Sequence, residues 1–180
     1  HTSSERSGYY PTAIDPLVFV RYDTSETIQD VSEPLFAIVV QGEKKLSLSE
    51  EKFQYGVAQY LVTSVDLPLS VCMIEATPDQ PYLGLKLNLD PAQLCAIIVQ
   101  TNPDIDKKEN SVRGLCVSDA SPSLIDCAIR LTKLLDTPQD IPFLAPLIIR
   151  EIYYRLLTDE QGEAVRQVAT FGSNMQRIAD

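Results

Sequence analysis

The stretch Tyr82-Leu83-Gly84-Leu85-Lys86-Leu87-Asn88-Leu89, followed by Asp90-Pro91, contains the change of pattern that decides the fold. Leucines occupy every second position from residue 83 to residue 89, which is the period of a β-strand with one buried face. Asp90 is a suitable N-cap, and Pro91 suits the first turn of a helix. The sequence therefore predicts a β region that ends here and a helical region that follows.

The β region contains short runs rich in Val, Ile, Leu, Phe and Tyr, separated by turn-forming residues. The predicted strands are residues 17–22, 35–40, 45–48, 59–65, 69–76 and 82–89. Between the second and third of them, Gln41-Gly42-Glu43 is a hairpin signal. Many short strands at near-regular spacing are typical of a sandwich or a small barrel.

The helical region begins with a short predicted helix over residues 91–100 and a polar loop over 102–113. Three helices follow, and proline or glycine marks an end of each. The first of the three begins at Ser121-Pro122. The second begins near Pro142 or Pro146 and ends at Leu157. The third runs from Asp159 to Ala169 and is stopped by Gly172.

Ser173 and Gln176 have the spacing of a capping box for one more helix. The sequence stops at Asp180, about two turns into that helix. We therefore expect the chain to be a fragment of a longer protein.

The composition is that of one soluble globular domain or two small ones, with 180 residues and a net charge of −10. The acidic balance argues against direct binding of nucleic acid or anionic membranes, because phosphate contacts need clustered Lys and Arg. The longest apolar run, residues 35–40, is too short to span a bilayer. The four cysteines are scattered, which is typical of buried thiols in a reducing compartment, so we expect a cytoplasmic protein.

Histidine is nearly missing from the sequence, since the only one is His1. An imidazole metal cluster, a Ser–His or Cys–His nucleophile pair and a histidine general base are therefore excluded. We expect no catalytic residues, no metal and no cofactor.

Several blocks of the sequence, in the same order, resemble the N-terminal domain of AraC-type bacterial transcriptional regulators. The blocks are residues 33–34, 41–45, 60–62, 64–68, 81–85, 89–91, 144–147, 150–157 and 176–179. The resemblance implies an α+β fold, in which a cupin-like β-barrel of the jelly-roll type is followed by a C-terminal helical segment. It also implies a non-catalytic domain that senses a small-molecule effector and forms a homodimer.

The resemblance divides the chain into three parts. Residues 1–112 would form the barrel with an N-terminal arm and one short helix, and residues 113–172 a helical subdomain that packs on it. Residues 173–180 would begin the linker to a C-terminal helix-turn-helix domain that the chain lacks. DNA would be contacted only through that domain.

Polar side chains inside apolar strands are the candidates for contacts with an effector of unknown identity. These residues are Arg21, Tyr22, Tyr60, Cys72 and Glu75. Arg21 and Glu75 could instead form an ordinary ion pair or be solvated, and the tyrosines and Cys72 could simply pack. Tyr9 and Tyr10 could fold over the barrel mouth or belong to a disordered arm.

Two apolar helix stripes are candidates for the dimer interface. They consist of Leu124, Leu131 and Leu135 in one helix and Ile148, Ile152 and Leu156 in another. Each stripe could equally pack on the barrel, because a surface helix needs one apolar face for that purpose.

Two other functions stay open. The domain could be a ligand-free interaction module if side chains such as Phe19, Phe36 and Phe53 fill the barrel. It could also be a cupin enzyme, although the metal-binding histidines of cupins are missing from the sequence. Residues 1–112 hold 8 Lys and Arg against 16 Asp and Glu. This excess disfavours an anionic effector, unless the charge at the pocket overrides it.

Overall fold

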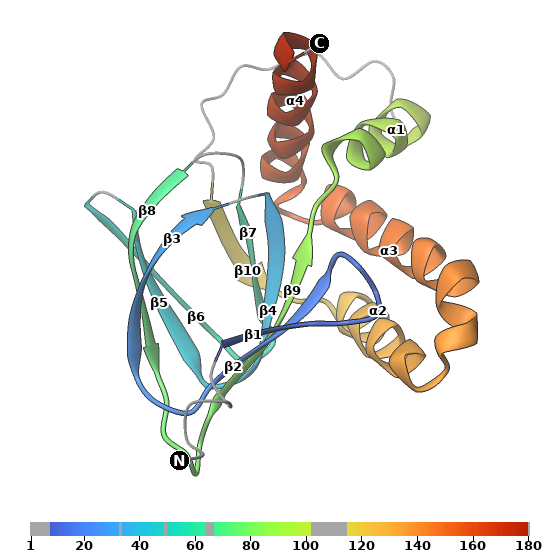
Figure 1. The fold of residues 1–180 in the computed structure, drawn as a ribbon. Helices are drawn as coiled ribbons and strands as arrows, with labels where there is room; N and C mark the ends of the chain where they lie inside the picture. Colours follow the sequence, from blue (N-terminus) through green and yellow to red (C-terminus); the bar gives the residue numbers. More distant parts are fainter. Residues whose placement is uncertain (1–7, 33, 49, 64–66, 102–114, 180) are drawn as a thin grey trace.

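The computed structural model has two β-sheets and a group of helices (Figure 1). It describes residues 8–32, 34–48, 50–63, 67–101 and 115–179, and of these it gives only the backbone for 28–32, 48, 67–73 and 171–179. The strands are β1 (Gly8–Pro11), β2 (Leu17–Tyr22), β3 (Glu26–Ser32), β4 (Leu35–Gln41), β5 (Glu43–Leu48), β6 (Glu51–Gly56), β7 (Gln59–Thr63), β8 (Leu67–Glu75), β9 (Tyr82–Asn88) and β10 (Leu115–Asp119). The α-helices are α1 (Pro91–Thr101), α2 (Pro122–Lys133), α3 (Ile141–Thr158) and α4 (Gly162–Ala179).

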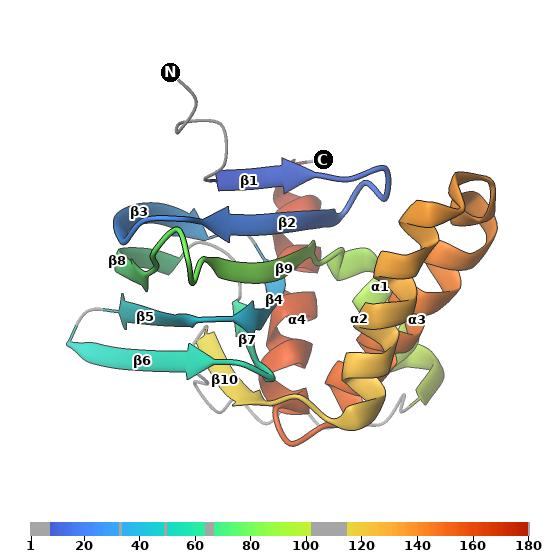
Figure 2. The ribbon, with the colours of Figure 1, turned by 90° about the horizontal axis from the view of Figure 1, so that it is seen from below.

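Both sheets are antiparallel. The larger has the strand order β1-β2-β9-β4-β7-β10, and the smaller has the order β3-β8-β5-β6. One face of the larger sheet packs on the smaller sheet, and the helices lie on its other side (Figures 1 and 2). The predicted α+β class is confirmed. The described strands form two separate sheets rather than a closed barrel, so the cupin-like jelly roll stays a prediction.

The larger sheet separates two apolar cores because successive side chains of a strand point to opposite faces. In β4, Phe36 and Ile38 belong to the core shared with the helices, whereas Leu35 and Val39 belong to the core between the sheets. The leucines of β9 follow the predicted alternation, and Leu87 is buried on the helix side.

The six predicted strands are confirmed where the structure describes them, and β1, β3, β6 and β10 were missed. The predicted hairpin at Gly42 is wrong, because β4 and β5 lie in different sheets. Gly42 has a φ of +88°, which only glycine adopts readily, and it turns the chain from one sheet to the other.

The predicted caps of the first two helices are confirmed. The Ala92 amide donates to Asp90 Oδ1 at 2.9 Å, and the Leu124 amide donates to Ser121 Oγ at 3.2 Å. The predicted loop over 102–113 lies outside the described residues.

The predicted end of the fourth helix at Gly172 and the new start at Ser173 are wrong, because α4 continues to Ala179. A glycine inside a helix costs about 1 kcal/mol, which is too little to end a helix that is packed along its length. The first turns of α4 are held in this way, by the buried residues Val165, Val168 and Ala169.

Candidate functional site

An open apolar groove of about 880 Å³ lies between the helix-side face of the larger sheet and α2. Its floor comes from β2, β4 and β9, and one wall from α2. The lining residues are Tyr10, Phe19, Val20, Arg21, Ile38, Val39, Val40, Val57, Ala58, Leu83, Gly84, Leu85, Ile125, Ala128, Ile129, Thr132 and Lys133. The volume lies within the range of about 300–1,000 Å³ that is typical of small-molecule sites.

The groove exists because the helices cover only part of each strand. Leu17 and Leu87 are cross-strand neighbours, and both are buried under α2 and α3. Further along the same strands, Phe19 lies opposite Leu85 and is only half-buried. One continuous apolar sheet face therefore changes from core to groove within a few residues.

The rim of the groove carries large apolar side chains that are open to solvent. Val40 is 53% exposed, Val57 is 61% exposed and Ile129 is 47% exposed. Single exposed apolar residues are common on proteins, but a cluster around a concavity is typical of a binding site.

Two charged residues line the groove, and both are cations. Arg21 Nε donates to Asp23 Oδ1 at 2.9 Å, so its charge is balanced by a neighbour. Lys133, in the last turn of α2, has no ion-pair partner among the described residues. Of the groove's hydroxyls, that of Thr132 donates to the Ala128 carbonyl oxygen at 2.8 Å.

Where the side chains of both sheets are described, the space between the sheets is almost filled. The cavity there has a volume of about 40 Å³, and the buried rings of Tyr22, Tyr55 and Tyr82 occupy the surrounding core. A volume of this size suits a water molecule or two rather than an effector. Among the described side chains, aromatic rings occupy the space between the sheets, so an effector pocket inside a barrel stays a prediction.

The four predicted ligand residues whose side chains are described do not come together at one site. Arg21 lines the groove, Tyr22 packs between the sheets, and Tyr60 is buried between the larger sheet and the helices. Glu75 is exposed and accepts a hydrogen bond from Lys45 Nζ at 3.1 Å, so Arg21 and Glu75 do not pair with each other. Cys72 lies in β8, where only the backbone is described.

Tyr60 connects β7 to the junction of α3 and α4. Its hydroxyl donates to Asp159 Oδ2 at 2.9 Å, and its ring contacts that of Phe36 at a centroid distance of 5.7 Å. Burial raises the pKa of Tyr60 above its usual range, and the hydrogen bond to Asp159 raises it further. The side chain is therefore a neutral tie between the sheet and the start of α4.

An ion-pair cluster holds α2, the helical wall of the groove, against α3. Arg130 contacts Asp126 at 2.8 Å and Glu151 at 2.6 Å, and Arg155 contacts Glu151 at 2.8 Å. The hydrogen bond from Arg130, followed by that from Arg155, lowers the pKa of Glu151 to about 2. Glu151 thus stays ionised over the physiological range.

The residues predicted for the dimer interface belong to the chain's own core. Leu124, Leu131, Ile148, Ile152 and Leu156 are buried, and Leu135 packs against the same core. That prediction is corrected, because five of the six side chains are buried within the chain and Leu135 is partly buried against them.

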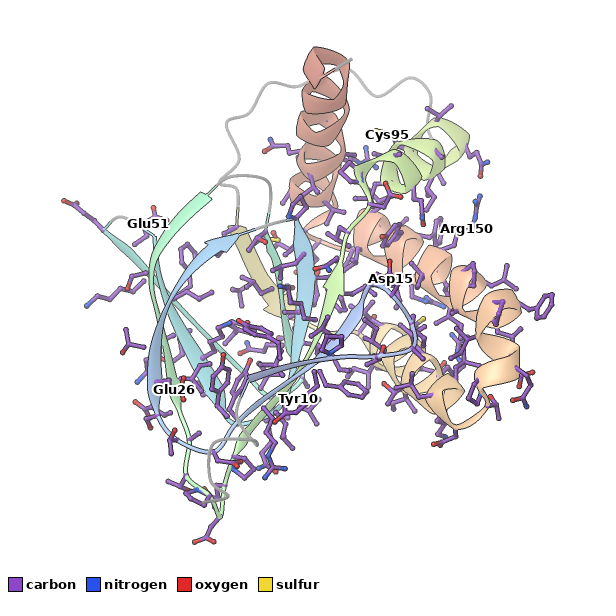
Figure 3. All side chains as sticks on the ribbon, in the orientation of Figure 1. Tyr10, Asp15, Glu26, Glu51, Cys95 and Arg150 are labelled. Atoms are coloured by element: carbon purple, nitrogen blue, oxygen red, sulfur yellow. The ribbon has the colours of Figure 1, made fainter. Side chains whose placement is uncertain are left out.

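A different face of α3 is exposed instead. Phe143 is 75% exposed, Leu147 is 62% exposed and Tyr154 is 48% exposed, and Arg150 lies between them on the outer side of the helix (Figure 3). Arg150 donates a hydrogen bond to Gln100 of α1. We call these four residues the outer α3 stripe.

Tyr9 and Tyr10 belong to the strand β1 rather than to a disordered arm. Tyr10 of β1 lies opposite Phe19 of β2 and lines the groove (Figure 3). Lys86 Nζ lies 5.3 Å from the centroid of the Tyr9 ring, a cation–π contact. Tyr10 therefore forms part of the groove's edge.

The described cysteines Cys95, Cys116 and Cys127 are unpaired. Burial raises the pKa of Cys116 to about 11 and also raises that of Cys127, so neither thiol has the thiolate character of a redox sensor.

The part of the chain that the structure describes contains no group of His, Cys, Asp or Glu that could hold a metal ion. Among the same residues, no helix combines the length and apolar character needed to cross a membrane.

The groove was missed at the sequence level, although its residues were within reach. Leu83 and Leu85 belong to the alternating stretch that predicted β9, and Ile125 and Ile129 flank the buried stripe of α2. The missing information was the register of the helices on the sheet.

The sequence matches the family described as the N-terminus of AraC-type transcriptional regulators over residues 13–164. A search of curated proteins finds no significant match.

Solved structures of ToxT from Vibrio cholerae are similar in fold. ToxT of strain SCE256 with bound unsaturated fatty acid superimposes with a TM-score of 0.53 at 6% identity, covering 96% of this chain and 65% of that one. ToxT of O395 bound to (E)-4-(8-methylnaphthalen-1-yl)but-3-enoic acid gives a TM-score of 0.52 at 9% identity, covering 89% and 55%. The chain thus spans about three-fifths of the ToxT chains that it matches.

Proposed function

Because the chain belongs to the family of AraC-type transcriptional regulator N-termini, we propose that it is the effector-sensing and dimerising part of a transcriptional regulator. In this proposal the DNA-binding part is a helix-turn-helix domain C-terminal to the chain, and α4, including residues 173–179, leads toward it. The chain itself has no catalytic role, and the regulator works in the cytoplasm. Effector binding biases the domain between two arrangements and so repositions the DNA-binding part.

The observation that carries the sensing role is the groove between the larger sheet and α2. It is concave, apolar and large enough for a small molecule, whereas the space between the sheets is not. Support also comes from the ToxT structures, which have a similar fold and hold an unsaturated fatty acid or (E)-4-(8-methylnaphthalen-1-yl)but-3-enoic acid.

A ligand bound in the groove would lie next to residues that connect the larger sheet to α4. Ile38 lines the groove and lies directly opposite Tyr60 in the β4–β7 register. Tyr60 in turn donates to Asp159, which precedes α4. A ligand that shifts Ile38 therefore acts on a strand pair that is tied to the start of α4.

We place the dimer contact on the outer α3 stripe. Phe143, Leu147, Arg150 and Tyr154 are spaced by four, three and four residues, which is the heptad spacing of helices that pair side by side. Beside the stripe lies a depression of about 310 Å³, lined by Ile97, Leu147 and Tyr154 among others, which could receive side chains of a second copy.

A ligand-free interaction module is the second candidate, and the filled space between the sheets favours it. The aromatic rings that fill this space are Tyr22, Tyr55 and Tyr82, whereas Phe36 and Phe19 lie on the helix side. In this alternative the groove holds part of another protein.

Thermal-shift screening against small apolar compounds tests the sensing role. Compounds that bind the groove should raise the melting temperature of the wild type but not that of Ile129→Trp, in which an indole fills an exposed part of the groove. Val99→Trp, at an exposed apolar position on α1 that does not line the groove, is the matched control. A broad screen without a stabilising compound would favour the interaction module.

Sedimentation velocity tests the dimer. Leu147→Glu should shift the chain from dimer to monomer, because a carboxylate replaces an apolar side chain at the centre of the outer α3 stripe. Val57→Glu, which places the same charge at an exposed position of the groove, should leave the dimer intact. A wild type that stays monomeric at high micromolar concentration would contradict this part of the proposal.

A further inference from the structure

We propose that the groove takes a monocarboxylic acid with an extended apolar body, and that Lys133 binds its carboxylate. This inference rests on the groove being the effector site, as proposed above, and adds the chemical class of the effector. It reverses the expectation, from the acidic composition of residues 1–112, that an anionic effector is disfavoured.

The charge at the groove differs in sign from the charge of the chain. The sequence has a net charge of −10, yet the charged residues that line the groove are Arg21 and Lys133. Two acidic side chains on or next to the elements that carry these cations are already paired, Asp23 with Arg21 and Asp126 with Arg130. The charges that line the groove therefore favour an anion, although the net charge of the chain is negative.

One uncompensated cation selects a monoanion. Asp23 balances Arg21, so Lys133 supplies a single net positive charge. A phosphate monoester carries almost two negative charges at neutral pH, and the second would stay unbalanced beside an apolar surface. A carboxylate carries a single negative charge, which Lys133 alone can balance.

The rest of the groove requires an apolar body. Ile38, Leu83 and Leu85 from the sheet and Ile125 and Ile129 from α2 offer only hydrocarbon surface. Because the Thr132 hydroxyl is already bonded to the Ala128 carbonyl, it adds little for a polar ligand. The site thus combines a long apolar surface with one cation, which matches an amphiphile with a single acidic end.

A purely structural role for Lys133 makes a different prediction. A lysine in the last turn of a helix stabilises the helix dipole, and this effect does not depend on any ligand. Replacement of Lys133 would then lower stability without distinguishing charged ligands from neutral ones.

Isothermal titration calorimetry with three probes of equal chain length separates these roles. The probes are dodecanoate, 1-dodecanol and dodecyl phosphate, each below its aggregation concentration. Dodecanoate should bind the wild type most tightly, and Lys133→Gln should weaken that binding by about three- to tenfold. The affinity for 1-dodecanol should be the same in both proteins. Lys52→Gln, which removes an exposed lysine of β6 in the other sheet, should match the wild type with all probes.

The outcomes distinguish this inference from the proposed function. If dodecanoate binds wild type and Lys133→Gln equally, or if 1-dodecanol or dodecyl phosphate binds more tightly, the carboxylate contact is wrong. If Ile129→Trp then abolishes binding of all three probes, the groove stays the ligand site. If no probe binds the wild type, this inference fails, and the broad thermal-shift screen decides the sensing role separately.

Discussion

The two faces of the larger sheet are built from the same strands, but one face is closely packed and the other is partly open to solvent. Toward the smaller sheet, Tyr22, Tyr55 and Tyr82 leave a cavity of only about 40 Å³. Toward the helices, aliphatic side chains such as Leu83 and Leu85 border a groove of about 880 Å³. Aromatic rings from two sheets can fill the space between them, whereas a sheet partly covered by helices leaves some of its apolar face open.

The described side chains between the sheets are closely packed, whereas the helix-side face leaves a groove. We have proposed this groove as the effector site. Substitutions that are matched in chemistry but placed on opposite faces should therefore separate stability from binding.

The largest difference is expected between Leu46→Ala and Leu83→Ala. Leu46 is buried between the sheets, so its truncation should cost about 2–5 kcal/mol in the free energy of unfolding. Leu83 is half-buried at the groove and its truncation should cost about 1 kcal/mol or less. Urea denaturation followed by circular dichroism measures both values. Equal losses would break the distinction between a filled face and an open one.

The adjacent residues Val39 and Val40 offer the same test within one strand. Val39 is buried between the sheets, and threonine there places a hydroxyl in an apolar core, which should cost about 2 kcal/mol. Val40 is exposed at the groove rim, so Val40→Thr should change stability by less than about 0.5 kcal/mol. If the two variants unfold at the same urea concentration, β4 has a different register from the one described.

Tyr60→Phe should weaken the connection between the larger sheet and the start of α4. The substitution removes the hydroxyl that donates to Asp159 and should cost about 1.5 kcal/mol, the lower value for a hydrogen bond to a charged group. Amide hydrogen exchange should become faster in the first turns of α4, around Val165, and stay unchanged in β5. Unchanged exchange in α4 would show that packing alone holds this helix.

Much of this architecture could be predicted from the sequence, because it depends on local patterns. The alternation in β9 identified the strand and its faces, and Ser121 and Asp90 identified the starts of two helices. The family was identified from blocks of sequence that lie within or close to the matched region.

The missed strands fail those local patterns for physical reasons. β6 contains Glu51, Lys52 and Gln54, since it is an edge strand with one face in water, and β1 is a short edge strand that ends in Pro11. Their pairing is set by neighbours that are distant in sequence, which no local pattern reports.

The candidate site was predicted less well than the fold. Of the four predicted ligand residues whose side chains are described, only Arg21 lines the groove, because strand membership alone does not say which face a polar side chain occupies. The predicted dimer stripes were true apolar stripes, but apolar periodicity marks the buried face of a helix more often than a contact with another chain.

The smallest expected effect concerns the α2 wall of the groove and depends on pH. The pKa of Glu151 is lowered to about 2 in the folded chain by its hydrogen bonds to Arg130 and Arg155, from about 4.5 when unfolded. The stabilisation from this group is therefore fully present above pH 4.5 and is lost as the pH falls toward 2. Because the Glu151 side chain is about a third exposed, solvent screening limits the effect to about 1 kcal/mol.

Glu151→Gln should thus be less stable than the wild type by about 1 kcal/mol at pH 7, and the difference should shrink between pH 4.5 and pH 2. Glu163→Gln, an exposed position of α4 without an ion pair among the described residues, is the control and should show no such trend. Urea titrations over this pH range, repeated in 0.5 M salt, measure the difference. A pH-independent difference would show that Glu151 acts through packing rather than through its charge, and that apolar contacts alone hold α2 against α3.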